Sequence, residues 1–270
     1  MGKEKLWSVS LFFFVFLIAA NVDAISDTER ENQIANKLIE QLHAGEAIWF
    51  GDDKTKFLGL YTETFLFQRQ DAILLLHGMG AHPDWPEVIS PLRWELPFHQ
   101  LPVLSIQLPI LSPDTPVSNY GKTTKEASRR INIAVDYLHK LGFSRVILVG
   151  YSFGAALGAH YLAHKKNHKI TAFIAISILA RNFLDPTLNL KFLLSKINIP
   201  ILDIYAADDY EEVLKAVPDR RLAAHKNGNG TFRQYEIPDT NHIYSDHTDH
   251  LIKVIVDWIE QNPENTDERI

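Results

Sequence analysis

The segment from Val146 to Ala156 carries the residues best suited to covalent chemistry. It is an apolar run followed by Gly150, Ser152 and Gly154 and then by small, helix-forming residues. This order predicts a buried strand that turns sharply into a helix, with Ser152 at the turn. The two glycines leave room for a tight turn, and the first amides of the helix place positive charge beneath the serine. Ser152 is therefore the predicted nucleophile of an acyl-transfer reaction.

A second apolar run, Leu74 to Leu76, leads into His77-Gly78-Met79-Gly80. The tetrahedral intermediate of acyl transfer needs two backbone N–H donors, one beside the nucleophile and one from the loop after a neighbouring strand. We expect Phe153 and Met79 to supply them. The substrate pocket is expected to include His77, Gly78, Trp85 and Tyr151. For His77, bracing the loop is the interpretation that we favour over direct catalysis.

A serine hydroxyl is a weak nucleophile, so a base must accept its proton. His242 follows the last predicted strand, 232–237, and precedes the final predicted helix. His247 and His250 compete for this role, but they fall at the start of that helix or inside it, where a solvated surface histidine is expected. The three histidines match no familiar metal-ligand spacing. We therefore expect neither a metal nor an organic cofactor.

The acid that orients the histidine is expected after the strand 201–205, where Asp208 and Asp209 are adjacent. In enzymes with this kind of turn the acid usually lies about nine residues after the leading proline of its strand, here Pro200. Asp209 is therefore the first choice and Asp208 the alternative. Asp203 lies inside the same strand, and its carboxylate must be paired or near the sheet edge, because burying it alone is costly.

The elements that must position these residues alternate between strands and helices. Short runs that are apolar on both faces predict parallel strands covered by helices on each side. These runs are 72–76, 103–106, 145–149, 172–176 and 201–205, and the clearest helices are 123–141, 153–164 and 248–261. Before them we expect a helix over 26–42, capped by Ser26 or Asp27, and a hairpin of strands 47–50 and 57–62.

The N-terminal residues 1–24 resemble a secretory signal peptide, with Lys3 and Lys5 before an apolar stretch that ends at Val22-Asp23-Ala24. An uncleaved anchor is the alternative; membrane contact is expected through this segment alone. Residues 25–270 are predicted to form one domain outside the cytoplasm. The formal net charge of −6 argues against a nucleic-acid partner, and the absence of cysteine excludes disulfides and thiolate chemistry.

Taken together, Leu74 to Gly80, Gly150 to Gly154, Asp209 and His242 make the chain resemble the α/β-hydrolase superfamily in order and spacing. The stretch His77-Gly78-Met79-Gly80-Ala81-His82-Pro83-Asp84-Trp85 further resembles an uncharacterised bacterial family of exported proteins, known as a domain of unknown function. The resemblance implies a mostly parallel sheet with helices on both faces and a periplasmic or secreted setting. One departure is Ala206 or Ala207 in place of the usual glycine before the acid.

The favoured function is a serine carboxylesterase or thioesterase that forms an acyl-serine intermediate. Peptidase activity is possible with the same residues. The alternative is a non-catalytic binding or scaffolding protein of the bacterial envelope, because a fold does not fix a function. A dinucleotide-binding fold is disfavoured, since no Gly-x-Gly-x-x-Gly follows the first parallel strand. Asp84 could contact substrate, although capping a helix that starts near Pro86 is the interpretation we prefer.

Overall fold

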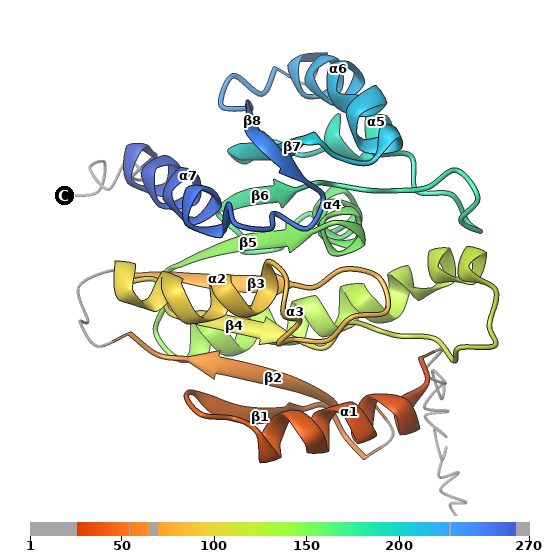
Figure 1. Cartoon of the computed structure of the whole chain (residues 1–270), viewed down its shortest axis with the longest axis vertical. Helices are drawn as coiled ribbons and strands as arrows, with labels where there is room; N and C mark the ends of the chain where they lie inside the picture. Colours follow the sequence, from red (N-terminus) through yellow and green to blue (C-terminus); the bar gives the residue numbers. More distant parts are fainter. Residues whose placement is uncertain (1–25, 54, 65–69, 227, 263–270) are drawn as a thin grey trace, which may run out of the picture.

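An eight-stranded sheet runs through the centre of the computed structural model, which describes residues 26–53, 55–64, 70–226 and 228–262 (Figure 1). The strands are β1 (Glu46–Phe50), β2 (Phe57–Thr62), β3 (Asp71–Leu76), β4 (Val103–Ile106), β5 (Arg145–Tyr151), β6 (Ala172–Ile176), β7 (Ile201–Asp208) and β8 (Arg233–Asn241). Their order is β1-β2-β4-β3-β5-β6-β7-β8. The first two strands are antiparallel, and the pairs from β4 to β8 are parallel.

The apolar runs are buried on both faces of the sheet, as predicted. In β3, Leu74 and Leu76 belong to an apolar cluster on one face of the sheet, whereas Ile73 and Leu75 belong to a separate cluster on the other face. This alternation follows from the two-residue period of a strand. The resulting fold is that of an α/β-hydrolase, with helices on both faces of a mostly parallel sheet.

The helices include the predicted ones and several that we did not predict. They are α1 (Thr28–Glu40), α2 (Ile89–Glu95), α3 (Thr124–Lys140), α4 (Phe153–His164), α5 (Leu190–Leu194), α6 (Glu211–Lys226) and α7 (Thr248–Gln261), with 3₁₀ turns η1 (Leu96–His99) and η2 (Val117–Thr123). Asp27 caps α1 by accepting a hydrogen bond from the Arg30 amide. Sequence periodicity did not reveal α6, which contains Pro218 and has few buried positions.

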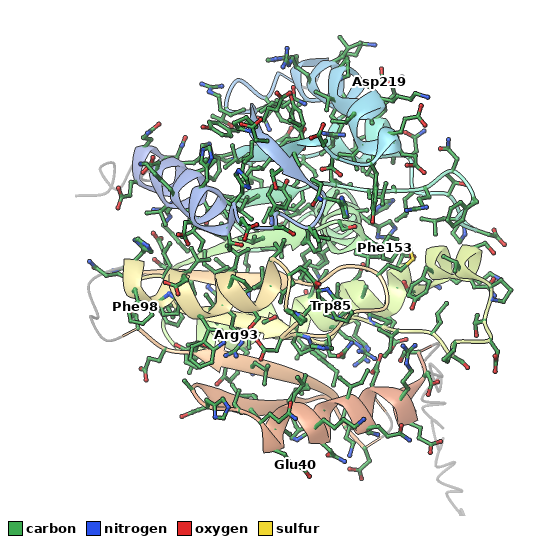
Figure 2. The ribbon with its side chains drawn as sticks, viewed as in Figure 1. Glu40, Trp85, Arg93, Phe98, Phe153 and Asp219 are labelled. Atoms are coloured by element: carbon green, nitrogen blue, oxygen red, sulfur yellow. The ribbon has the colours of Figure 1, made fainter. Side chains whose placement is uncertain are left out.

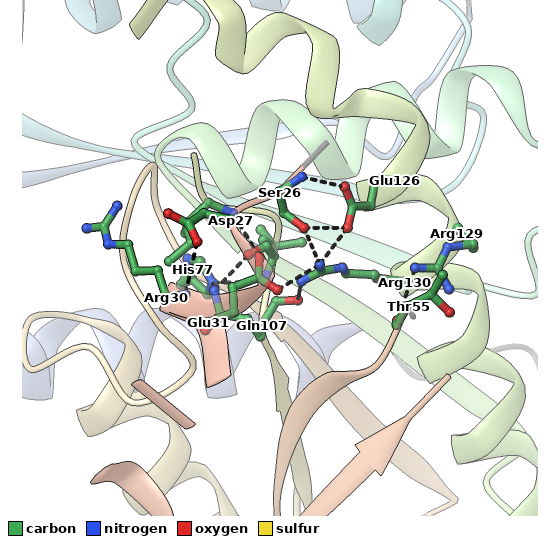
Figure 3. A network of polar contacts seen from close by, with 12 residues as sticks. Ser26, Asp27, Arg30, Glu31, Thr55, His77, Gln107, Glu126, Arg129 and Arg130 are labelled. Atoms are coloured by element: carbon green, nitrogen blue, oxygen red, sulfur yellow. Dashed lines mark hydrogen bonds and ion pairs between the residues drawn. The ribbon is translucent and has the colours of Figure 1, made fainter. Parts of the chain in front are cut away.

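A buried ionic cluster fastens α1 to α3. Arg130 is fully buried and its guanidinium lies 2.8 Å from Glu31 and 2.6 Å from Glu126 (Figure 3). It also donates to the Ser26 hydroxyl and to the carbonyl of Gln107, which follows β4. A charge can be buried in this way because it is paired and hydrogen-bonded. The cluster therefore ties the start of the described chain to α3 and to the end of β4.

Asp203, inside β7, is paired as its burial requires. Its carboxylate accepts hydrogen bonds of 2.8 Å from Arg220 of α6 and from Gln234 of β8.

The predicted signal peptide, residues 1–24, lies outside the described residues, and export therefore stays a prediction. Within the described ranges, every helix is too short or too polar to cross a membrane.

Candidate active site

Ser152 lies in the sharp turn between β5 and α4. Its φ of 55° and ψ of −120° place it in a region that side chains rarely adopt. A Cβ atom on Gly154 would come 2.3 Å from the carbonyl oxygen of His77, and one on Gly150 would come 2.6 Å from the Ala155 Cα. Only glycine at these two positions lets the helix, the strand and the neighbouring loop approach so closely. The turn thus directs the Ser152 hydroxyl beyond the carboxyl ends of the strands.

The imidazole of His242 lies between Ser152 and Asp209. Its Nε2 atom is 3.0 Å from the Ser152 Oγ, and its Nδ1 atom is 2.6 Å from the Asp209 Oδ1. An ionised carboxylate only accepts, so Nδ1 carries the proton and Nε2 is left to accept from the serine. All three side chains are buried, with exposed fractions of 8% for Ser152, 6% for His242 and 7% for Asp209. In this geometry the imidazole of His242 can accept the proton of the Ser152 hydroxyl, and the Asp209 carboxylate can stabilise the positive charge that results.

A local irregularity separates Asp209 from Asp208. The register between β7 and β8 shifts between Ala206 and Asp208, and Asp208 remains in the ladder opposite Asn241. Asp208 is exposed, whereas Asp209 turns inward to the histidine. A bulge of this kind re-aims side chains near a site. The departure from the usual glycine, at Ala206 and Ala207, therefore does not move the carboxylate away from His242.

Two hydroxyl groups that the sequence analysis missed hold Asp209. Ser177, which follows β6, donates to the Asp209 Oδ2, and the Tyr244 hydroxyl lies 2.8 Å from the Ser177 Oγ. Since Ser177 gives its one proton to the carboxylate, Tyr244 is the donor to Ser177. Burial alone would raise the pKa of Asp209, but hydrogen bonds from His242 and Ser177 outweigh it and hold that pKa below its ordinary value. The carboxylate therefore stays ionised.

The loop after β3 lies against the nucleophile, but His77 is not part of the pocket wall that we expected it to join. His77 is buried; its Nδ1 lies 2.8 Å from the Gly78 carbonyl and its Nε2 accepts from the Leu108 amide at 2.9 Å. Burial lowers the pKa of His77 from 6.5 to about 3, so the ring is neutral. It braces the loop, because both ring nitrogens are committed to backbone groups.

A cavity of about 470 Å³ opens above Ser152. Its walls include both expected oxyanion donors, Met79 and Phe153, and three residues expected to line the pocket, Gly78, Trp85 and Tyr151. Phe153 is the first residue of α4, so its amide has no acceptor inside the helix. Trp85 and Phe153 are labelled in Figure 2. The space above the serine is therefore lined by several apolar side chains and by both residues expected to supply the oxyanion donors.

Two tyrosines flank His242. The ring of Tyr210 stacks on the imidazole, with centroids 4.1 Å apart, and the ring of Tyr151 lies at 5.3 Å. The Tyr151 hydroxyl donates to the carbonyl of His242 at 3.0 Å and so fixes the histidine loop. Burial raises the pKa of Tyr151 well above its ordinary value, which keeps this donor protonated. Tyr210 was not predicted, although its position directly after the candidate acid was a usable signal.

The remaining candidates lie elsewhere. The expectation that Asp84 caps a helix is wrong: α2 begins at Ile89 behind Val88, and Asp84 accepts from the buried Arg93 at 2.9 Å. His250 contacts Tyr235 at 3.2 Å, and His247 bonds to the Ser245 carbonyl. Within residues 26–53, 55–64, 70–226 and 228–262, no group of three or more His, Asp or Glu side chains is arranged to hold a metal ion.

Solved structures similar to this chain share its fold. Est1E from Butyrivibrio proteoclasticus is 16% identical with a TM-score of 0.63, covering 81% of this chain and 98% of that one. XC6422 from Xanthomonas campestris, described as an α/β serine hydrolase without lid, is 12% identical with a TM-score of 0.62, covering 81% and 95%. The Pyrococcus furiosus esterase Pf2001 is 15% identical with a TM-score of 0.63, covering 83% and 95%. The likeness at this identity establishes the fold.

Comparison with curated proteins gives no match. The family described as "Protein of unknown function (DUF3530)" matches residues 19–129 and 112–261, which together span most of the sequence and every candidate site residue. The matched residues include the loop after β3, the turn at Ser152, Asp209 and His242. The chain therefore belongs to the DUF3530 family, whose fold here is that of an α/β-hydrolase.

Proposed function

We propose that the protein is a serine hydrolase that cleaves carboxylic esters or thioesters, with Ser152 as nucleophile, His242 as base and Asp209 as the orienting acid. The observation that carries this proposal is the continuous set of hydrogen bonds from Asp209 through His242 to Ser152 at the floor of the cavity. The name of one structural neighbour, the Pyrococcus furiosus esterase Pf2001, supports an ester substrate, and another neighbour, Est1E, has been solved with ferulic acid bound.

The reaction follows from this geometry. His242 Nε2 takes the proton of Ser152 as its Oγ bonds to the substrate carbonyl carbon, and the Met79 and Phe153 amides stabilise the resulting oxyanion. The bond to the leaving oxygen or sulfur then breaks as His242 returns the proton to that atom. Water, giving its proton to His242, attacks the acyl-serine; the acid leaves and the proton returns to Ser152. Asp209 stabilises the imidazolium in both halves.

The test is labelling by a fluorophosphonate probe together with hydrolysis of a neutral para-nitrophenyl ester. Ser152→Ala should abolish labelling and lower kcat/KM by at least about 10⁴-fold, and His242→Ala should reduce both strongly, because each removes a member of one catalytic unit. His250→Ala, a surface histidine of α7, is the matched control and should behave as wild type. A folded wild-type protein that neither labels nor hydrolyses esters would favour the non-catalytic binding role instead.

A further inference from the structure

Among the described residues that line the cavity above Ser152, Arg181 is the only arginine or lysine. It lies between β6 and α5, and its guanidinium packs 5.6 Å from the centre of the Tyr210 ring and 5.7 Å from that of Phe183. Tyr210 in turn stacks on His242. The guanidinium therefore packs against two aromatic rings. One of them, Tyr210, stacks on His242, the general base of the proposed reaction.

The pairing of Arg181 differs from that of the buried arginines. Arg93, Arg130 and Arg220 are fully buried, and each lies within 2.9 Å of a carboxylate oxygen. Arg181 is 33% exposed, and the carboxylate found beside it, Glu212, is 3.8 Å away and 54% exposed. An exposed pair at that distance contributes little and is readily exchanged. The guanidinium can therefore turn its donors to a ligand in the cavity.

The cavity also holds one carboxylate of its own, Glu87, from the loop before α2. Its charge acts on Tyr151 and His82, which belong to the strand β5 and the loop after β3. Arg181 contacts Tyr210 and Phe183 instead. A ligand group that reaches Tyr210 or Phe183 therefore meets the positive charge of Arg181.

We propose that the preferred substrates are esters that carry an anionic group, such as a second carboxylate, and that Arg181 binds this group while the ester carbonyl lies at Ser152. The inference rests on the proposed function. A guanidinium binds a carboxylate through two parallel N–H···O bonds, which sets orientation as well as affinity. Arg181 is thus a specificity-determining residue, and it acts on binding rather than on the proton transfers.

Matched esters that differ only in charge test this proposal. On the acyl side these are para-nitrophenyl hexanoate, the mono-para-nitrophenyl ester of adipate and the ester of omega-aminohexanoate, which are neutral, anionic and cationic. On the leaving-group side they are the acetate esters of para-hydroxybenzamide and para-hydroxybenzoate. Wild type should prefer the anionic member of at least one series, and the responding series identifies the side on which Arg181 binds.

Arg181→Gln should raise KM for the preferred anionic ester by about 10- to 100-fold, the effect of losing a charge-assisted hydrogen-bonded pair. It should lower kcat/KM for the neutral ester at least about fivefold less than for the anionic one, with the loss mainly in KM, because the proton transfers stay intact. Arg181→Lys should retain part of the preference, because it keeps the charge but not the planar fork. The control Arg221→Gln, which removes an exposed charge outside the cavity wall, should change neither ester.

Three results would overturn the proposal. They are a wild type that prefers neutral or cationic esters, an Arg181→Gln variant that loses anionic and neutral esters equally, and an Arg221→Gln variant that reproduces the loss. Labelling of Ser152 by the fluorophosphonate separates these outcomes from failure of the proposed function. A labelled enzyme without charge preference would overturn only the role of Arg181, whereas an unlabelled, inactive wild type would overturn both.

Discussion

Two of the buried polar networks in the described part of the chain, one around Arg130 and one around His242, differ in how they end. The Arg130 network is closed: its guanidinium faces two carboxylates, a hydroxyl and a carbonyl, all within the protein. The His242 network runs from Tyr244 through Ser177 and Asp209 and finishes at a hydroxyl under a cavity. Both pair their buried charges, but only the second leaves a hydroxyl oxygen facing open space.

On the proposed function, the Arg130 network contributes mainly to the stability of the fold and the His242 network mainly to the rate of hydrolysis. A closed ionic network resists the loss of any member, because an uncompensated charge would remain buried. An open network holds its members for proton transfer, and its loss is felt mainly in rate. Variants in the Arg130 network should therefore change mainly the free energy of unfolding, and variants in the His242 network mainly kcat/KM. If both quantities change together in either set, the two networks are not independent.

The largest expected effect is that of Asp209→Asn in the open network. The amide can no longer hold Nδ1–H in place and stabilise the imidazolium, so kcat/KM for a neutral ester should fall by about 10⁴-fold. Asp208→Asn is the matched control and should stay within about threefold of wild type, because Asp208 is exposed. Equal losses from the two substitutions, measured by steady-state kinetics, would contradict the assignment of the acid to Asp209.

Substitutions in the Arg130 network should lower the free energy of unfolding. Arg130→Met removes the cation facing Glu31 and Glu126, and the free energy of unfolding should fall by about 3–5 kcal/mol in denaturant titrations. Activity measured well below the unfolding transition should stay within about threefold. Lys253→Met, which removes an exposed ion pair with Asp257, should leave stability unchanged. A large loss of kcat/KM in folded Arg130→Met would show that the two networks are not independent.

A smaller effect is expected from Ser177→Ala, which removes one hydrogen bond inside the His242 network. Loss of one hydrogen bond to Asp209 should lower kcat/KM by about 10-fold at neutral pH. It should also raise the pKa of Asp209 in the folded protein. Since that pKa is depressed in wild type, the ionised carboxylate stabilises the fold at neutral pH, and this contribution is lost as the pH falls through the folded value.

Acid unfolding of Ser177→Ala should therefore begin at a higher pH than that of wild type, as followed by circular dichroism. Tyr244→Phe, one hydrogen bond further from the carboxylate, should shift it in the same direction but less. If both variants keep wild-type rates and acid stability, the two hydroxyls do not position Asp209.

Features built from neighbouring residues could be predicted from the sequence. Strands β3 to β7 were visible as short apolar runs, and the turn at Ser152 was visible because Gly150, Ser152 and Gly154 lie within five consecutive residues. The helices α5 and α6 were not predicted: α5 is short, and Pro218 and the few buried positions of α6 obscure its period. Local pattern therefore predicted the sheet better than the helices beside β7.

Features that depend on distant contacts were harder to predict. The choice between Asp208 and Asp209 depends on a bulge against β8, and Ser177 and Tyr244 meet Asp209 only in three dimensions. Ser177 did offer one signal, because it directly follows β6, at the carboxyl edge that also carries Ser152. His77 was placed on the correct loop, but its sequence position could not tell whether the ring faces the cavity or the interior.

The backbone at Ser152 has an evolutionary consequence. A serine with a φ of 55° costs on the order of 1–3 kcal/mol, whereas glycine adopts such values freely. Selection for a stable fold alone would let this position drift to glycine. On the proposed function, family members that use this hydroxyl are expected to keep a serine between the two glycines, and members without turnover are expected to carry Gly-x-Gly-x-Gly at this turn.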